Sequence, residues 1–199
     1  MVTMTMTMTM TKTYKVILGS KSPRRQELLR GMDIDFEVMT ADTDESYPDD
    51  IANYDIPEYL SRRKMEAIRQ LPLPDNYLII TADTLVFANG EVMGKPRDKE
   101  EARLMLQNLS DKIHEVVTGV TVATASTVKS FSSLSRVHFA KLDDNDIEHY
   151  IEKYKPFDKA GAYGIQEWIG YIGITGIEGS FYNVMGLPTH KLYSVLKGF

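Results

Sequence analysis

The sequence of 199 residues contains no cysteine, which excludes disulfide bonds and catalysis by a thiolate. It also lacks any apolar run near the roughly 20 residues that a membrane-spanning helix requires. Positive charge is not in excess: the formal net charge is −5, whereas general nucleic-acid binders are usually basic. Two catalytic signatures are missing too, a GxxxxGK[ST] phosphate loop and a serine in a nucleophile elbow. We therefore expect a cytoplasmic protein that binds neither membrane nor nucleic acid.

What the sequence does contain is typical of a folded domain, since 43% of its residues are hydrophobic and 26% are charged. Residues 1–11 alternate methionine and threonine, without the continuous apolar core or the basic start of a signal peptide. We interpret them as a disordered or artefactual leader, and residues 12–199 as one domain.

Apolar runs and helical spacing alternate irregularly along the rest of the chain, which predicts an α/β fold with a mixed sheet. Strands are expected at residues 14–19, 35–40, 75–87, 91–96, 114–124 and 129–142. Helices are expected at residues 23–32, 56–71, 98–109, 143–154 and 187–199. The glycine-rich residues 159–186 read as a loop with short strands.

An unusual helix start follows the first strand. Ser22 is typical of an N-cap and Pro23 of the first helical residue, yet Arg24 and Arg25 come next. Cations are unfavourable at the positive end of a helix dipole, so neither arginine should stabilise the empty protein. A bound anion would reverse both penalties, which predicts a phosphate or polyphosphate cradle. The alternatives are an exposed basic turn and a kinase target of the Ser-Pro type.

A carboxylate ends the apolar strand of the segment IITADTLVFANGEVMGKP. An aspartate there, Asp83, is costly unless it is paired or faces a cleft. The dipeptide Asn89 and Gly90 signals a two-residue hairpin, which would place Thr84 opposite Lys95 and Asp83 diagonal to Lys95. This arrangement suits either a reactive site or an ordinary structural ion pair.

Two further segments carry charges that could join such a site. Lys64 shares a helical face with Leu60, so it points inward or to a cleft edge, unless it snorkels at the surface. The acidic loop holds Asp42, Asp44 and Glu45, carboxylates that could bind Mg²⁺ or Mn²⁺ or simply be solvated.

The segment GAYGIQEW places Gln166 among glycines that would let a flat ligand approach closely. Its side-chain amide offers both a donor and an acceptor, as a group that recognises a nucleotide base must. The alternative is an ordinary glycine loop.

Together and in order, these segments resemble the Maf family of nucleoside triphosphate pyrophosphatases. The likeness runs from about residue 14 to the C-terminus through LGSKSPRRQELL, DTDES, YLSRRKMEA, TADTLV, GKPRD, GAYGIQEWIG and GSFYNVMGLP. It implies an elongated mixed β-sheet flanked by helices, with two lobes and a central cleft, as in inosine triphosphatases. It also implies hydrolysis of a nucleoside triphosphate to the monophosphate and pyrophosphate, with a divalent metal, Mg or Mn.

The resemblance also implies roles for particular residues. Asp83 matches the family's proton acceptor, and with Glu45 it is a candidate metal ligand. The GIQ form resembles the branch that acts on dTTP and UTP. The family often has alanine where Gly19 and Met65 stand. The expected substrate-binding residues are Ser22, Arg24, Arg25, Lys64, Thr84, Lys95 and Gln166.

Two other functions remain open from the sequence. One is removal of the γ-phosphate at the same site, which would release phosphate in place of pyrophosphate. The other, which the resemblance to the Maf family suggests, is a non-catalytic nucleotide-sensing regulator linked to septum formation, which would not need Asp83. The sequence also leaves open whether the protein acts alone or as a homodimer.

Overall fold

The structure is a computed structural model that describes residues 13–199, so the predicted leader at residues 1–11 lies outside the described residues. The described chain divides into two compact units. The first unit contains residues 13–83, 118–133 and 186–199, and the second contains residues 84–117 and 134–185. The predicted central cleft stays a prediction.

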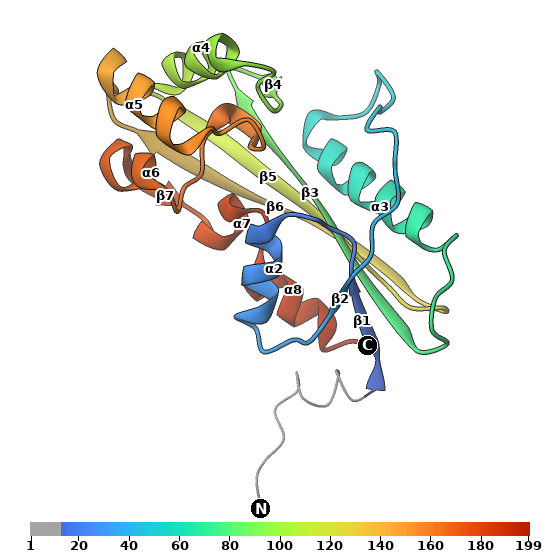
Figure 1. The fold of residues 1–199 in the computed structure, drawn as a ribbon. Helices are drawn as coiled ribbons and strands as arrows, with labels where there is room; N and C mark the ends of the chain where they lie inside the picture. The colour runs from blue at the N-terminus through green and yellow to red at the C-terminus, as the bar shows by residue number, and fades with distance from the viewer. Residues whose placement is uncertain (1–12) are drawn as a thin grey trace, which may run out of the picture. The chain divides into compact units, whose positions relative to one another are not determined.

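The described strands form one seven-stranded sheet in the order β2-β1-β3-β5-β6-β7, with β4 paired to β3 (Figure 1). β1 runs parallel to β2 and β3, whereas β4 is antiparallel to β3 and β7 is antiparallel to β6. The predicted mixed sheet is thus confirmed. The strands are β1 (Lys15–Leu18), β2 (Glu37–Val38), β3 (Tyr77–Ala88), β4 (Glu91–Met93), β5 (Ile113–Ala123), β6 (Val128–Phe139) and β7 (Ile174–Glu178).

Helices cover both faces of β6 in the first unit. Ser132 donates a hydrogen bond to Glu58 on one face, while the ammonium of Lys191 lies over the ring of Phe131 on the other. Successive side chains of a strand point to opposite faces, so the helices that carry Glu58 and Lys191 lie on opposite sides of β6. The helices of this unit are α2 (Pro23–Arg30), the short η1 (Asn53–Asp55), α3 (Ile56–Ile68) and α8 (Thr189–Leu196).

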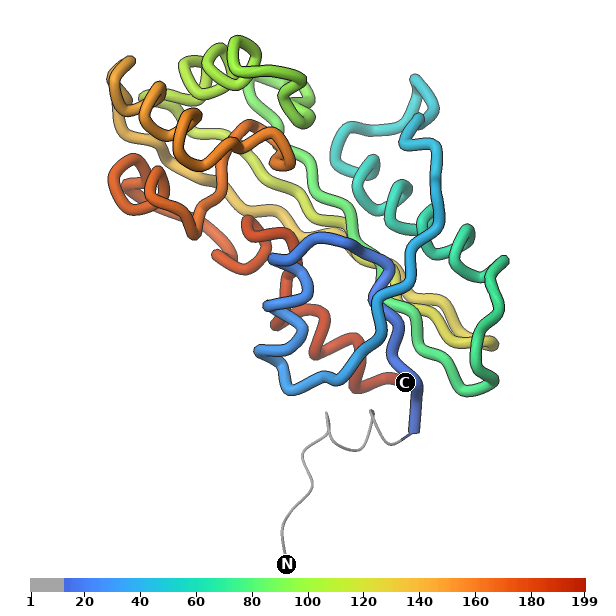
Figure 2. Tube along the Cα trace, viewed as in Figure 1, coloured from blue at the N-terminus to red at the C-terminus, as the bar shows by residue number. Residues whose placement is uncertain are grey.

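The start of the described chain lies beside the C-terminus (Figure 2). The hydroxyl of Tyr14 donates a 3.3 Å hydrogen bond to the carbonyl of Phe199. A core cluster fills the space between α3 and strands β1, β3 and β5. Met65 is only 2% exposed within it, so this methionine fills volume that alanine would leave empty. The buried members of the cluster are Ile17, Met65, Ile68, Ile79 and Ala123.

Gly19 is in close contact with its neighbours. A Cβ atom at this position would lie 2.4 Å from Cδ1 of Ile68 and 2.6 Å from Cγ2 of Thr81. We expect Gly19→Ala to lower the free energy of unfolding by about 1–3 kcal/mol, the usual cost of overpacking a core. Chemical denaturation measures this loss.

A matched control and a rescue test the same contact. Gly94→Ala should change stability little, because a Cβ at Gly94 meets nothing within 4 Å. Thr81→Ser removes the crowded methyl group and keeps the hydroxyl, so it should partly restore the Gly19→Ala protein. Equal stability of the Gly19→Ala and wild-type proteins would mean that the neighbours yield without cost.

The second unit contains more helix than the sequence predicts. Residues 159–186, read as a loop with short strands, contain the predicted short strand β7 but also the 3₁₀ turn η2 and the two α-helices α6 and α7. The two α-helices have six and five residues, less than two turns, and so leave no periodic pattern in the sequence. The helices of this unit are α4 (Lys99–Leu109), α5 (Asp144–Tyr154), η2 (Ala160–Ala162), α6 (Trp168–Gly173) and α7 (Phe181–Met185).

Across residues 13–199, no helix combines the length and the apolar character that crossing a membrane requires.

Candidate active site

The predicted basic helix start is present at the N-terminus of α2. The hydroxyl of Ser22 accepts a 3.5 Å hydrogen bond from the backbone N–H of Arg25, so Ser22 is the N-cap, and Pro23 is the first helical residue. The first turn carries no acidic side chain. The unpaired N–H groups and positive dipole of this helix end are therefore joined by Arg24 and Arg25.

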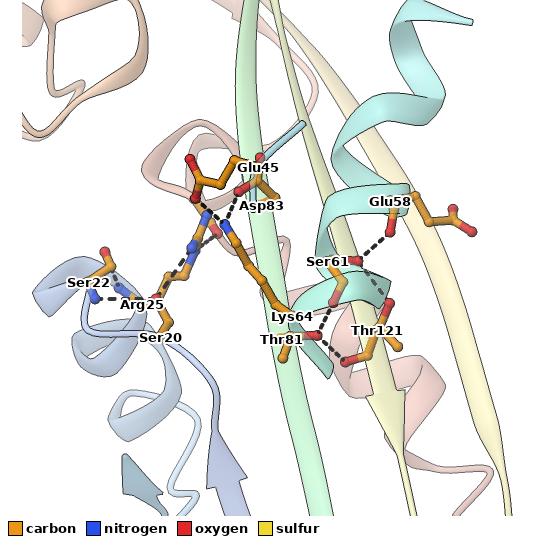
Figure 3. Close-up of polar contacts among 11 residues, drawn as sticks. Ser20, Ser22, Arg25, Glu45, Glu58, Ser61, Lys64, Thr81, Asp83 and Thr121 are labelled. Atoms are coloured by element: carbon orange, nitrogen blue, oxygen red, sulfur yellow. Dashed lines mark hydrogen bonds and ion pairs between the residues drawn. The ribbon is translucent and has the colours of Figure 1, made fainter. Parts of the chain in front are cut away.

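The side chain of Arg25 is hydrogen-bonded to other residues of the first unit. Its Nε donates a 2.8 Å hydrogen bond to the carbonyl of Gly186, and its Nη1 donates one of 3.3 Å to the hydroxyl of Ser20 (Figure 3). Burial lowers the pKa of the Arg25 guanidinium, the charges of Asp83 and Glu45 oppose that shift, and Arg24 adds to it. The guanidinium is thus held in a fixed position beside two carboxylates.

These bonds lead us to expect that Arg25, unlike what the sequence indicated, stabilises the empty protein. Arg25→Ala should lower the free energy of unfolding by about 1–3 kcal/mol, because it leaves the buried carbonyl of Gly186 without this donor. Thermal melts without nucleotide measure this loss, and a melting temperature equal to that of the wild-type protein would contradict it.

An ion cluster lies beside Arg25 (Figure 3). The ammonium of Lys64 donates a hydrogen bond to Oδ1 of Asp83 and lies 2.9 Å from Oε1 of Glu45. The side chains of Lys64 and Asp83 are 17% and 12% exposed, whereas that of Glu45 is 57% exposed. Helix α3, strand β3 and the acidic loop thus each bring one charge to the cluster. Of the alternatives that the sequence left open for Lys64, the structure shows a largely buried side chain and not one that snorkels at the surface.

Buried hydroxyl groups fix α3 on β3 next to this cluster. Oγ1 of Thr81 donates a 2.7 Å hydrogen bond to the carbonyl of Ser61, and the hydroxyls of Ser61 and Thr121 lie 2.8 Å apart (Figure 3). Thr81 comes two residues before Asp83 on one face of the strand, and Ser61 comes about one helical turn before Lys64. The hydroxyl contacts therefore set the distance between Lys64 and Asp83.

The sequence analysis missed this hydroxyl group network. Its one signal was Ser61, a polar residue at a helical position otherwise occupied by the buried residues of α3.

The predicted pairing of Asp83 through the hairpin needs a correction. The register is as expected, with Ala88 paired to Glu91 and Val86 to Met93. Strand β4 ends at Met93, however, so the ladder stops before Thr84 could pair with Lys95. The cation that contacts Asp83 is Lys64, from a helix rather than from the hairpin.

Two carboxylates of the acidic loop, Asp44 and Glu45, make different contacts. Asp44 accepts a 2.9 Å hydrogen bond from the backbone N–H of Ser46 and one from its hydroxyl, and the hydroxyl bond is the larger cause of the lowered pKa of Asp44. Glu45 instead contacts Lys64. Within residues 13–199, no group of three or more histidine or carboxylate side chains is arranged to hold a metal ion. The pair Glu45 and Asp83 still fits Mg²⁺, which takes one or two protein carboxylates and completes its shell with water and substrate phosphates.

Gln166, in the second unit, has an unsatisfied acceptor. Among the described residues, no donor reaches its buried Oε1. A Cβ at Gly164 would lie 3.0 Å from Nε2 of Gln166 and 2.9 Å from Cδ of Glu167, so glycine leaves the room that these side chains use. The amide is thus held close to the backbone with its oxygen available to a donor.

A buried polar network supports this segment. The hydroxyl of Tyr150 accepts a 2.9 Å hydrogen bond from the N–H of Gly164 and donates one to Glu167. The ammonium of Lys159 lies 3.2 Å from Oε1 of Glu167. Burial, more than the bond to Glu167, raises the pKa of Tyr150, so its hydroxyl stays protonated as a donor. The sequence analysis did not single out these residues, because their spacing matches no motif.

A family model described as "Maf-like protein" matches residues 15–199. The chain belongs to the Maf-like family. Its relatives include proteins named dTTP/UTP pyrophosphatase from Parabacteroides distasonis (57% identical, 94% of this chain and 97% of that protein), Bacteroides thetaiotaomicron (54%, 92% and 95%) and Porphyromonas gingivalis (53%, 94% and 96%).

The candidate site residues that the sequence predicts are divided between the two units of this Maf-like chain. Thr84 lies in strand β3 and Lys95 is exposed beyond the end of β4. The second unit contains Thr84, Lys95 and Gln166. The first unit contains Ser22, Arg24, Arg25, Glu45, Lys64 and Asp83.

Proposed function

We propose that this Maf-like chain hydrolyses nucleoside triphosphates, preferably dTTP and UTP, to the monophosphate and pyrophosphate. The observation that carries the proposal is a partly buried carboxylate, Asp83, flanked by the cations Arg25 and Lys64. The names of relatives at up to 57% identity support the substrate class and favour an enzyme over a nucleotide-sensing regulator. The homodimer stays a prediction.

Cationic side chains would neutralise the phosphates. A triphosphate brings about four negative charges, and positive groups already in position favour the charge that develops on the leaving pyrophosphate. Arg25 is fixed by its hydrogen bonds to Gly186 and Ser20, so its side chain would lose little conformational entropy when a phosphate binds. We assign phosphate binding to Ser22, Arg24, Arg25, Lys64 and Lys95, and base and sugar recognition to Thr84 and Gln166.

Asp83 would accept a proton from the attacking water or hold the metal, and Glu45 would share that metal. A bound Mg²⁺ or Mn²⁺ lowers the pKa of water and neutralises phosphate charge. Asp83 is suited to either role because two groups keep its carboxylate in place, the ammonium of Lys64 and the neighbouring guanidinium of Arg25.

A substrate panel tests the proposed reaction. UTP, dTTP, CTP and GTP are supplied with Mg²⁺, and both phosphate and pyrophosphate are measured. We expect pyrophosphate and monophosphate in equal amounts, with label from H₂¹⁸O in the monophosphate. Phosphate with a nucleoside diphosphate would instead identify γ-phosphate removal. Nucleotide binding without any product would favour the regulator.

Glu45→Gln should raise the Mg²⁺ concentration needed for half-maximal activity, because it removes one of two candidate metal-ligating charges. Asp44→Asn is a poor control, because both carboxylate oxygens of Asp44 accept hydrogen bonds from Ser46, so Asp42→Asn in the same loop serves instead. Mg²⁺ titrations of the three proteins make the comparison. Full wild-type activity in excess chelator would remove the metal from the mechanism.

A further inference from the structure

We propose that Lys64 takes the place of the metal in the nucleotide-free protein, so that its ammonium and a divalent metal bind Glu45 and Asp83 in turn. The proposal rests on the metal role proposed above. Its observation is one ammonium that contacts two carboxylates from different elements, 2.9 Å from Glu45 and hydrogen-bonded to Asp83 (Figure 3).

The ammonium and a metal cannot share these oxygens at close range. A metal bound by both carboxylates would lie among the atoms that Lys64 now contacts, and like charges repel strongly at such distances away from bulk water. The Lys64 side chain is only 17% exposed, so water screens this repulsion little. Metal binding therefore requires the ammonium to leave at least one carboxylate.

Lys64 is the cation that is suited to move. Its ammonium is a point charge at the end of a flexible chain, whereas the guanidinium of Arg25 is fixed by hydrogen bonds to Gly186 and Ser20. A phosphate offers the ammonium a new anionic partner and frees the carboxylates. Metal and triphosphate would then bind with positive coupling, and the free protein would bind the metal weakly.

Metal titration of the nucleotide-free protein tests this exchange. Lys64→Met removes the charge and keeps an unbranched side chain, and we expect it to tighten Mn²⁺ binding at least about tenfold in calorimetry or electron paramagnetic resonance, because like-charge competition is gone. Lys64→Arg keeps the charge, so its Mn²⁺ affinity should stay as low as that of wild type.

Two further variants test whether the gain in Mn²⁺ affinity arises at Glu45 and Asp83. Arg62→Met removes the same charge from an exposed position of α3, where Arg62 pairs with Glu58 at 3.7 Å, and should leave Mn²⁺ affinity unchanged. Adding Glu45→Gln to Lys64→Met should abolish the gain. Wild-type affinity in a folded Lys64→Met protein would overturn the proposal, as would an equal gain in Arg62→Met.

A measurement on the wild-type protein covers the case in which Lys64→Met fails to fold. In nucleotide-free crystals soaked with Mn²⁺, anomalous density between Glu45 and Asp83 should occur only where Lys64 has turned away. Density there with the ammonium still on both carboxylates would overturn the proposal. The metal measurements contain no nucleotide, so failure of the proposed hydrolysis would show in the product assay and not in these results.

Discussion

Asp83→Asn is expected to lower kcat by at least about 100-fold while nucleotide binding survives, the usual loss for a proton acceptor or metal-positioning group. The substitution keeps the size of the side chain and an oxygen that can accept from Lys64, but it removes the charge. Lys64 keeps Glu45 as an ionic partner, so the ammonium is not left unpaired. The chemistry should therefore fail without loss of the fold.

Turnover and nucleotide affinity are measured separately for this variant, with calorimetry for binding and product analysis for kcat. Asp75→Asn is the matched control, because Asp75 is an exposed residue of the same unit and loses the same charge. The control should retain wild-type kcat. A kcat close to wild type in Asp83→Asn would show that Asp83 has neither proposed role.

Local features of the fold could be predicted from the sequence. Ser22 caps α2 and Pro23 begins it, because both preferences depend on the few residues around a helix start. Asn89 and Gly90 set the hairpin register because the length of the turn determines which residues face each other. Each of these interactions spans only a few positions along the chain.

Contacts between distant segments could not be predicted in the same way. Arg25 bonds to a carbonyl that is 161 positions away along the chain, and no spacing in the sequence indicates that partner. The sequence left open whether Lys64 lies inward or at a cleft edge or snorkels at the surface, and it did not identify Asp83 as the partner, because helix α3 reaches strand β3 through tertiary packing. The sequence analysis therefore made the same prediction for both arginines. The structure shows that Arg25 is hydrogen-bonded to Gly186 and Ser20.

Gln166→Glu is expected to lower kcat/KM for UTP and dTTP by about 10- to 100-fold, since one unmet buried hydrogen-bonding group costs about 1–3 kcal/mol. Uracil and thymine present an N3–H donor beside carbonyl acceptors. The buried Oε1 of Gln166, which none of the described residues reaches with a donor, suits the N3–H, and the amide N–H suits a carbonyl. Glutamate would lose that donor and repel the carbonyl.

The same argument predicts the base preference of the wild-type protein. Cytosine has no hydrogen on N3 and carries an amino group at position 4, so CTP would leave buried groups unpaired and be a poor substrate. The methyl group of thymine adds only apolar contact, so dTTP and UTP should differ little.

The comparison is kcat/KM for UTP, dTTP, CTP and GTP in wild type, Gln166→Glu and a charge control, Gln70→Glu. Gln70 is exposed just beyond the end of α3, so its substitution adds the same charge at a surface position. The control should keep both the rate and the preference. Equal efficiency of wild type with UTP and CTP would mean that a group other than Gln166 recognises the base, because an amide that accepts from N3–H discriminates between these two bases.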